Sequence, residues 1–384
     1  MFLIDYPYVS NFLKDTIAKK KYPVIQTKEA LELLKNKNIN WITSAKAVTS
    51  LKNHKNFKLY TNSENSIDWV FKNLEDTNQA KWIEIFKDKF AFRELIKDIY
   101  PDFFFKKITI KKIQTLDVKK YPFPFVIKPS IGFFSLGVHI VNNLNEWNTI
   151  KKQLQPENLK HIYPDNVINT SSFIIEAYIE GKEYAVDCYF NEKGKPIIQN
   201  ILLHKFASKT DVSDRVYYTS KEIIEQYHDK LSLFLSKIGD KMLLKNFPLH
   251  IEIKINKDDK ITPIEVNPMR FGGWCTTADL AWFAYQFNPY INFMENKSPD
   301  WEFVLDGREN YKYAIIILST TTEIQSKNIR FDYKKLTQQF EKIIHIRKLD
   351  YKKYNFFGFA FIATKNETEL DAFLASDLSE YIIN

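Results

Sequence analysis

The stretch His250–Gly273, "HIEIKINKDDKITPIEVNPMRFGG", decides how the chain is interpreted. It reads as two apolar strands joined by a short polar turn, with Glu252, Glu265 and Asn267 inside the strands and Arg270 shortly after them. Successive side chains of a strand point to opposite faces, so each strand has one apolar and one polar face. A hairpin with a polar outer face is the plainer interpretation, and a binding site on that face is the alternative.

The pairing of the two strands separates these interpretations. If the turn centres between its two aspartates, Glu252 lies opposite Glu265 and His250 lies opposite Asn267. Like charges in directly opposed positions destabilise a sheet, so a plain outer face leaves the two carboxylates unexplained. Two carboxylates and an amide oxygen form a hard oxygen site that suits Mg²⁺, which prefers few protein ligands together with substrate phosphates. We therefore predict that Glu252, Glu265 and Asn267 bind Mg²⁺, or Mn²⁺ in its place, beside a nucleotide.

A second motif is "FVIKPSIGFFSLGV", residues 125–138, in a chain that has only nine glycines. Lys128 ends a strand, and the loop that follows carries the small residues Ser130, Gly132, Ser135 and Gly137. Backbone amides of such a loop can wrap phosphate oxygens, and a lysine can neutralise them. The P-loop signature is absent, so a glycine-containing hairpin is the alternative.

A third motif is "IIEAYIEGKEYAVD", residues 174–187. An apolar strand reaches Glu176, turns at Gly181 and resumes with Glu183. Extended backbone beside an apolar pocket can hydrogen-bond an adenine edge, and a carboxylate can bind ribose hydroxyls. Taken alone, the segment also fits an ordinary strand–turn–strand.

The three motifs occur together in one order. A Lys-Pro loop with glycines is followed by Glu-x-x-x-x-Gly-x-Glu, and then by two glutamates with an Asn-Pro and a nearby arginine. This order resembles the ATP-grasp superfamily over about residues 85–300, and plausibly extends to the N-terminal lobe and the "FGFAFIATKNETELDAF" ending. The combination is much more specific than any of its parts.

The resemblance implies roles for individual residues. Lys89, in "KDKFAFRELI", resembles an upstream phosphate-binding lysine, and Lys128 with the loop of residues 130–137 would hold the phosphates of ATP. Glu176, with the backbone of Ala177 and Ile179, would line the adenine pocket, and Glu183 would bind ribose. The magnesium ligands of the family match Glu252, Glu265 and Asn267.

Arg270 resembles the family arginine that steadies the transferred phosphate, and with Lys128 it would be catalytic. The common pattern is Asn-Pro-Arg, whereas Met269 intervenes here, so the arginine is displaced by one position. The implied reaction moves the γ-phosphoryl group of ATP to a substrate carboxylate, and an amine then attacks the acyl phosphate to give an amide. No Ser/His/Asp nucleophile is needed, and the seven histidines show no metal-ligand spacing.

The pattern of apolar residues predicts the fold class. Up to about residue 105, short apolar runs alternate with helical patterns such as residues 81–100, which predicts a Rossmann-like parallel sheet without G-x-G-x-x-G. The middle of the chain is richer in strands. We expect α/β and α+β architecture, with an N-terminal α/β lobe (1–105) that resembles a pre-ATP-grasp domain. An ATP-grasp small lobe (106–182) and a large lobe (183–384) with a strand–helix ending would follow.

Composition limits the classes of partner. The formal net charge is +8, but only six of the 55 basic residues are arginine and the lysines are scattered, which argues against nucleic-acid binding. No apolar run approaches a membrane span, and the N-terminus does not resemble a signal peptide. Two cysteines cannot form a disulfide framework. We expect a cytoplasmic protein that binds small molecules, with a homodimer as an open expectation.

Substrate identity is not evident from the sequence. Arg215, Tyr217 and Trp274 are candidates for the acceptor pocket, with Arg215 as a carboxylate clamp; a surface arginine and core aromatic residues are the alternative. Three functions are open. We favour a carboxylate–amine ligase acting on an amino acid or small carboxylate. The others are a different ATP-grasp chemistry, such as carboxylation or a nucleotide-pathway step, and a non-catalytic nucleotide-binding module.

Overall fold

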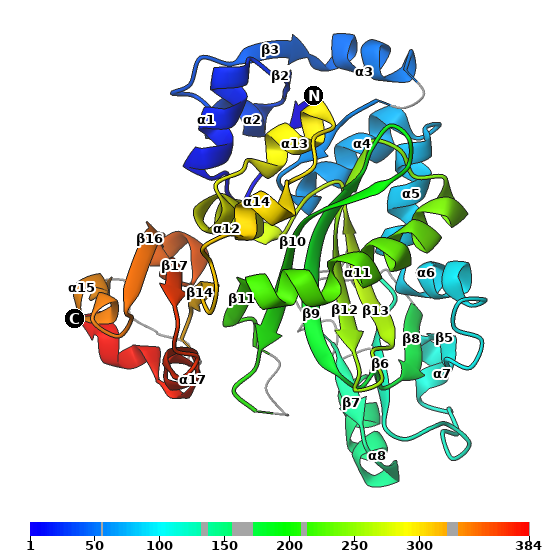
Figure 1. Cartoon of the computed structure of the whole chain (residues 1–384). Helices are drawn as coiled ribbons and strands as arrows, with labels where there is room; N and C mark the ends of the chain where they lie inside the picture. Colours follow the sequence, from blue (N-terminus) through cyan, green and yellow to red (C-terminus); the bar gives the residue numbers. More distant parts are fainter. Residues whose placement is uncertain (55–56, 132–136, 156–171, 209–212, 321–328, 384) are drawn as a thin grey trace. The chain divides into compact units, whose positions relative to one another are not determined.

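The computed structural model describes residues 1–54, 57–131, 137–155, 172–208, 213–320 and 329–383, and its elements are labelled in Figure 1. The chain divides into two compact units. The first contains Met1–Thr77 and Lys182–Asn384, and the second contains Asn78–Gly181. The three-part division at residues 105 and 182 stays a prediction, although the second unit ends one residue before the latter boundary.

The first unit begins with a parallel four-stranded sheet in the order β3-β2-β1-β4. Three helices connect its strands, and the side chains of Ser10, Thr27 and Thr43 accept hydrogen bonds from their first turns. This arrangement confirms the Rossmann-like lobe. The elements are β1 (Phe2–Leu3), α1 (Asn11–Lys20), β2 (Pro23–Gln26), α2 (Lys28–Leu33), β3 (Asn40–Thr43), α3 (Ser44–Lys52), β4 (Tyr60–Thr61), η1 (Glu64–Ser66) and α4 (Ile67–Leu74).

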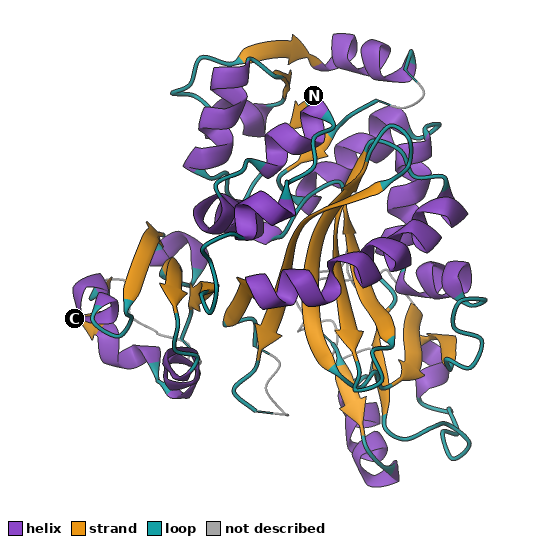
Figure 2. Ribbon diagram, in the orientation of Figure 1, coloured by secondary structure: helices purple, strands orange, loops and turns teal. Residues whose placement is uncertain are grey.

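An eight-stranded antiparallel sheet forms the centre of the same unit, and Figure 2 shows its strands in orange. Their order is β13-β12-β9-β10-β11-β14-β17-β16, so strands from distant parts of the sequence become neighbours. The strands are β9 (Lys182–Phe190), β10 (Pro196–Lys205), β11 (Val216–Ser220), β12 (Phe247–Ile255), β13 (Ile261–Pro268), β14 (Lys312–Leu318), β16 (Lys342–Lys348) and β17 (Gly358–Thr364).

Helix α11 (Lys221–Met242) lies across one face of this sheet (Figure 1). Most of its apolar residues recur at helical spacing and are buried, and each of these contributes about 1.5–3 kcal/mol when fully removed from water. The ring of Tyr227 contacts that of Tyr184 on β9, with centroids 5.0 Å apart. At Gly239 a Cβ would lie 2.3 Å from the ring of Phe190, so only glycine allows the helix this close to β9.

Helix α12 (Thr276–Tyr285) covers part of the opposite face, where Leu280 packs with Ala185, Leu202 and Phe361. A second core joins the parallel sheet to this region: Phe2 and Tyr60 pack with Tyr189, Phe271 and Tyr290. This shared core explains why residues 1–77 form one unit with residues that follow 181. The neighbouring short helices are η2 (Gly273–Cys275), α13 (Pro289–Glu295) and α14 (Trp301–Leu305).

The C-terminal part adds β15 (Arg330–Phe331), α15 (Tyr333–Thr337), α16 (Tyr351–Tyr354), α17 (Thr368–Ala375), η3 (Leu378–Tyr381) and β18 (Ile382–Ile383). Strand β17 is buried along its whole length between β14 and β16, and α17 follows it. The predicted strand–helix ending is therefore confirmed.

The second unit is an antiparallel sheet in the order β5-β8-β6-β7 with helices. Phe125, Ile127, Phe173 and Ile175 share a core with Trp147 of α8. Their alternation sends Lys128 and Glu176 to the other face. Its elements are α5 (Asn78–Lys87), α6 (Lys89–Ile96), β5 (Phe105–Thr109), α7 (Ile110–Ile113), β6 (Phe125–Pro129), β7 (His139–Val141), α8 (Leu144–Gln153) and β8 (Ser172–Ala177). Together the two units confirm the mixed α/β and α+β class.

Candidate functional site

One face of the eight-stranded sheet carries polar residues in rows that cross neighbouring strands. The rows follow from strand register, because directly opposed residues have Cβ atoms about 5 Å apart. The other face of these strands is apolar and lies under α11. The first row is Asn267, His250, Asp187 and Asn200; the second is Glu265, Glu252, Ala185 and Leu202; the third contains Lys254 opposite Glu183, and His204 opposite Tyr217.

The hairpin pairs the residues that the sequence placed together. Glu252 lies opposite Glu265, and His250 lies opposite Asn267. The register shifts just after Glu252, where Ile253 pairs with Pro263, although an unshifted pairing would place it opposite Ile264. This irregularity moves the centre of the turn onto Asp258, so the predicted turn position was off, while the pairing at the predicted ligand positions is confirmed.

The carboxylate of Glu252 lies in an acidic environment. Burial, followed by repulsion from Glu265, Glu183 and Asp214, raises the pKa of Glu252 well above its usual range. The nearest ring nitrogen of His250 is 3.8 Å from Glu252 Oε1, which is too long for a hydrogen bond. A cation bound at this position would offset the repulsion directly.

The donor set fits a hard divalent cation. Glu252 and Glu265 offer carboxylate oxygens, and Asn267 can offer an amide oxygen, which suits Mg²⁺. Among the described residues, no three His, Cys, Asp or Glu side chains converge on one metal position. A metal here would therefore depend on ligands that the protein does not supply, such as water or phosphate, and the metal assignment stays a prediction.

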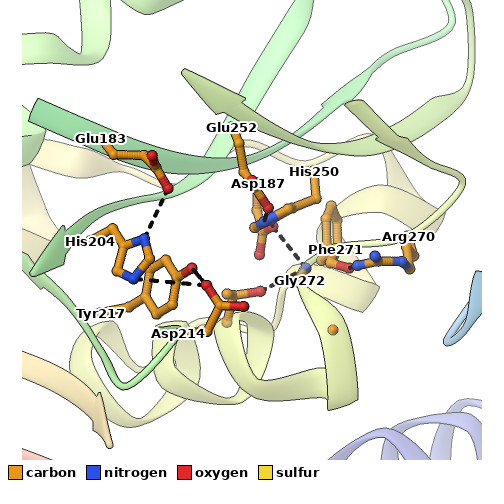
Figure 3. A network of polar contacts seen from close by, with 12 residues as sticks. Glu183, Asp187, His204, Asp214, Tyr217, His250, Glu252, Arg270, Phe271 and Gly272 are labelled. Carbon is orange, nitrogen blue, oxygen red and sulfur yellow. Dashed lines mark hydrogen bonds and ion pairs between the residues drawn. The ribbon is translucent and has the colours of Figure 1, made fainter. Parts of the chain in front are cut away.

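Glu183 belongs to a small cluster on the same face (Figure 3). Its Oε1 lies 2.9 Å from Nδ1 of His204, and the ring of His204 stacks on that of Tyr217 with centroids 4.1 Å apart. Tyr217 donates a hydrogen bond to Asp214 Oδ1 at 2.8 Å. Burial, together with Asp214, Glu252 and Glu183, raises the pKa of Tyr217 well above its usual range, so the phenol stays protonated.

A second cluster surrounds Asp187, which is fully buried (Figure 3). Its Oδ1 lies 2.7 Å from Nδ1 of His250 and accepts a hydrogen bond from the backbone N–H of Gly272 at 2.9 Å. Asp187 thus ties β9 to β12 and to the segment after β13. The N–H of Gly272 also donates to Thr277 Oγ1, and a Cβ at Gly272 would lie 2.3 Å from the Thr277 methyl group, so the position requires glycine.

Met269, the residue that separates Asn-Pro from Arg270, adopts a left-handed backbone with φ of 64°. Its N–H donates to Pro248 O, its carbonyl accepts from Thr61 N–H, and its side chain is fully buried. The extra residue is thus built into the core. The guanidinium of Arg270 forms an ion pair with Glu64 Oε1 at 2.7 Å, and its role toward a phosphate stays a prediction.

Trp274 also has a left-handed backbone, with φ of 58°. Its indole stacks on Tyr8, with centroids 5.9 Å apart, and its carbonyl accepts a hydrogen bond from Nη1 of Arg347 at 2.6 Å. Arg347 is buried and also forms an ion pair with Asp279. A β16 residue therefore holds the backbone of the segment that carries the candidate acceptor-pocket tryptophan.

Arg215 does not support the carboxylate-clamp hypothesis. Its guanidinium is buried, donates to the carbonyl oxygens of Phe373, Leu374 and Ser376, and lies over the Phe373 ring. These contacts satisfy the last carbonyl groups of α17, which have no partner within the helix. The alternative of a surface arginine is also wrong, because Arg215 is 6 % exposed.

The second unit contains its own buried polar cluster. Glu176 forms ion pairs with Lys128 Nζ at 2.6 Å and with Arg93 Nε at 2.7 Å, and all three side chains are almost fully buried. Burial alone would raise the pKa of Glu176, but Arg93 and Lys128 lower it to about 2. Burial lowers the pKa of Lys128, although Glu176 opposes that shift. The two predicted residues thus contact each other directly, and Arg93, which the sequence did not single out, is a second partner of Glu176.

Lys89 and Ser130 lie beside this cluster. The N–H of Lys89 donates to Ser130 O at 2.8 Å, and the Ser130 hydroxyl hydrogen-bonds to Asp88, the residue that caps α6. Burial opposes ionisation of Asp88, yet the bonds from Ser130 and the α6 amides lower its pKa. Lys89, Lys128 and Ser130 therefore come together as predicted, on the face that also holds Glu176.

The remaining predicted residues are only partly tested. Gly132 and Ser135 lie outside the described residues, and Gly137 has a φ of 74°. The N–H of Ala177 already donates to Phe104 O, and Ile179 is half-buried beyond the end of β8. Their roles toward adenine and phosphate stay predictions.

Two further features of the described residues, their helices and a surface cavity, bear on function. None of their helices is long and apolar enough to cross a membrane. A surface cavity of about 750 Å³ lies beside α11 and α14, and its lining includes Lys221, His228 and Trp301 but none of the predicted site residues. We assign it no function.

Part of the chain matches a known protein family. Residues 121–278 match the family model described as an ATP-grasp domain, whereas no curated protein sequence matches the chain. An L-amino acid ligase from Bacillus licheniformis has a similar structure, with a TM-score of 0.65, 16% identity, and coverage of 99% of this chain and 97% of that one.

Two other solved structures are similar over nearly their whole length. N5-carboxyaminoimidazole ribonucleotide synthetase from Thermotoga maritima gives a TM-score of 0.63 at 15% identity, with coverage of 99% of this chain and 98% of that one. A biotin carboxylase–ATP complex from Campylobacter jejuni gives 0.62 at 10% identity, with coverage of 100% and 91%. At these identities the likeness concerns the fold. The match at residues 121–278 and the similar folds agree with the resemblance to the ATP-grasp superfamily.

Proposed function

We propose that the protein is an ATP-dependent carboxylate–amine ligase that forms an amide through an acyl phosphate. ATP would phosphorylate the carboxylate and leave as ADP, and the amine would then displace phosphate and release a proton. An amino acid or another small carboxylate is the expected substrate. The similarity of the fold to that of an L-amino acid ligase supports this choice.

The observation that carries the proposal is the direct opposition of Glu252 and Glu265, with Asn267 in the adjoining row. The hairpin holds two carboxylates side by side in a setting that raises the pKa of Glu252. Such an arrangement is unfavourable in an isolated protein and becomes favourable when a cation is shared. A bound Mg²⁺ would offset the charge of the ATP phosphates.

Further residues are proposed to bind the nucleotide. In the second unit, Lys89, Lys128, Ser130, Gly132, Ser135 and Gly137 would hold phosphates, and Glu176, Ala177 and Ile179 would border adenine. Lys128 is buried against Glu176, so a phosphate would have to share it with that carboxylate. In the first unit, Glu183 would bind ribose and Arg270 would steady the transferred phosphate.

The acceptor pocket would include Tyr217 and Trp274 but not Arg215. Tyr217 lies on the polar face, and Trp274 is held at the start of α12 by Arg347. The guanidinium of Arg215 is engaged by the end of α17. A carboxylate substrate would therefore need another cationic partner.

A second candidate function is carboxylation. The similar folds of the carboxyaminoimidazole synthetase and the biotin carboxylase support it. Both candidates use ATP and release ADP and phosphate, so they differ in the substrate rather than in the nucleotide product. Dependence of ADP release on bicarbonate, instead of on an amine, would favour carboxylation.

The compartment and assembly are also proposals. Cys188 and Cys275 are buried and form no disulfide, which agrees with a reducing cytoplasm. We expect small-molecule partners without nucleic acid, and a homodimer is the assembly to test first.

The test begins with Mg-ATP and pooled amino acids and small carboxylates. ADP and phosphate that appear only with a carboxylate and an amine would support the ligase, and AMP with pyrophosphate would refute the acyl phosphate. Glu265→Gln should abolish turnover while the fold is kept, whereas Glu192→Gln, in the exposed β9–β10 turn, should have no effect. If Glu265→Gln retained turnover, the metal assignment would be wrong.

A further inference from the structure

His204 is buried on the polar face and has no role in the proposed reaction. Its side chain is 1 % exposed, and it reaches Glu183 from the neighbouring strand β10. Strands β9 and β10 are antiparallel, and the pairing of Leu203 with Tyr184 leads His204 directly toward Glu183. The contact is therefore set by the sheet register.

The imidazole of His204 is fixed in position by four groups. Its ring contacts the rings of Tyr217 and Phe206, with centroid separations of 4.1 and 3.8 Å. Nδ1 lies 2.9 Å from Glu183 Oε1, and Nε2 lies 3.2 Å from the carbonyl oxygen of Ser213. Both nitrogens therefore face oxygen atoms of neighbouring residues.

Glu183 is fixed differently. Its side chain is 16 % exposed, and among the described residues its carboxylate forms a hydrogen bond with His204. One oxygen is held, which leaves the second able to accept from a ligand. A carboxylate that is already oriented loses little rotational freedom when it binds, and this favours binding.

We infer that His204 is a positioning residue that orients Glu183 to accept a hydrogen bond from a ribose hydroxyl of the nucleotide. The inference rests on the proposed function, because that function assigns Glu183 to the ribose. His204 itself would not touch the nucleotide. Its effect should therefore appear in the selectivity for ribose hydroxyls rather than in phosphate or adenine binding.

The simplest alternative is that His204 only fills the core. A purely structural role would lower the stability of the fold and weaken all nucleotides alike. Orientation of Glu183 instead predicts that ADP is weakened selectively, while analogues that lack the contacted hydroxyl are unaffected. The two explanations thus differ in a measurable ratio.

The test is calorimetric titration of the full-length protein, with Mg²⁺ present, using ADP, 2′-deoxyADP and 3′-deoxyADP. A hydrogen bond to a charged group predicts that the wild type prefers ADP over at least one analogue by about tenfold or more. His204→Leu should reduce that preference to below about threefold without changing the affinity for the same analogue. His204→Asn should retain much of it, because its amide nitrogen can occupy the position of Nδ1.

Two controls make the result specific. His228→Leu changes a partly exposed histidine of α11 and should leave the preference unchanged. The double variant Glu183→Gln/His204→Leu should lose no more preference than either single variant, because both act through one contact. Thermal unfolding of each variant checks that the fold is kept.

Each contrary outcome points to a different error. If His204→Leu keeps the full preference, or weakens all three nucleotides equally, the positioning role is wrong while nucleotide binding stands. If the wild type binds ADP without preference, the assignment of Glu183 to ribose fails and the inference with it. If the wild type binds no ADP, the proposed function and the inference both fail.

Discussion

Replacing Glu176 by Gln tests the buried cluster of the second unit. The carboxylate is 2 % exposed and lies between Arg93 and Lys128. Glutamine keeps the size of the side chain but removes the charge, which leaves two buried cations facing a neutral amide. Removing one partner of a buried ion pair costs about 3–5 kcal/mol, because an uncompensated charge remains.

The shift in pKa gives a second value for the same effect. The pKa of Glu176 falls from 4.5 to about 2. A difference of roughly 2.5 units at 1.36 kcal/mol per unit corresponds to about 3 kcal/mol. Because the pKa in the folded state is lowered, this stabilisation is present above pH 4.5 and is lost as the pH falls toward 2. About 1 kcal/mol should be lost by pH 4 and about 2 kcal/mol by pH 3.

Native-state hydrogen exchange of peptides from β6 and β8 measures the second unit separately from the first. At pH 7 these strands should open with a free energy about 3 kcal/mol lower in Glu176→Gln than in the wild type. Urea unfolding followed at the same peptides between pH 6 and 3 should also show a weaker pH dependence in the variant. The matched control is Glu94→Gln in α6, an exposed partner of Lys97, with an expected change below about 0.5 kcal/mol. A cost for Glu176→Gln no larger than that of the control, or an unchanged pH dependence, would refute the reasoning.

Two further predictions concern the segment after β13. Gly272→Ala should destabilise the first unit by about 1–3 kcal/mol, because the new Cβ would lie 2.3 Å from Thr277. Gly273→Ala should be nearly neutral, because no atom lies within 4 Å of the new Cβ. Chemical unfolding compares the two variants, and equal losses of stability would contradict the packing argument. Asp187→Ala should speed hydrogen exchange of the peptide spanning residues 269–275 by roughly 100-fold, since His250 and Gly272 lose a shared charged acceptor. Asp187→Asn, which keeps one oxygen, should change it much less, and similar exchange in the two variants would exclude the proposed anchoring.

Local patterns predicted the parts of the site that depend on one hairpin or one loop. The alternation in β12 and β13 and the polar turn fixed the opposition of Glu252 and Glu265, although a register shift moved the turn itself. These residues are close in sequence, so periodicity and turn chemistry are sufficient.

The residues that were missed depend on pairing between distant strands. Asp187 meets His250 because β9 lies beside β12, although 63 residues separate them. Glu176 meets Arg93 across 83 residues of sequence. Nothing in the spacing of either pair reports the contact, since sheet order is set by how all the strands pack. One signal was present: an aspartate in the middle of the apolar run of β9 must have a buried partner.

The contacts of Arg215 were not evident from the sequence for a related reason, and its role toward a substrate stays a prediction. Scarcity of arginine made it a candidate for a ligand, but a guanidinium can equally satisfy backbone carbonyls at a helix end. Its partners belong to residues 373–376, more than 150 positions later, and only the tertiary structure brings them together.

The two clusters surround their carboxylates with opposite kinds of charge. In the second unit, Glu176 has two cationic partners within 2.7 Å, and its pKa is lowered. In the first unit, Glu252 faces Glu265, Glu183 and Asp214, and its pKa is raised. The nearby Arg270 is held by Glu64, and His250 is held by Asp187. Glu176 is thus compensated by two cationic partners, whereas Glu252, which is 25 % exposed, lies among like charges. We therefore propose that Glu252 and Glu265, rather than Glu176, receive an external cation.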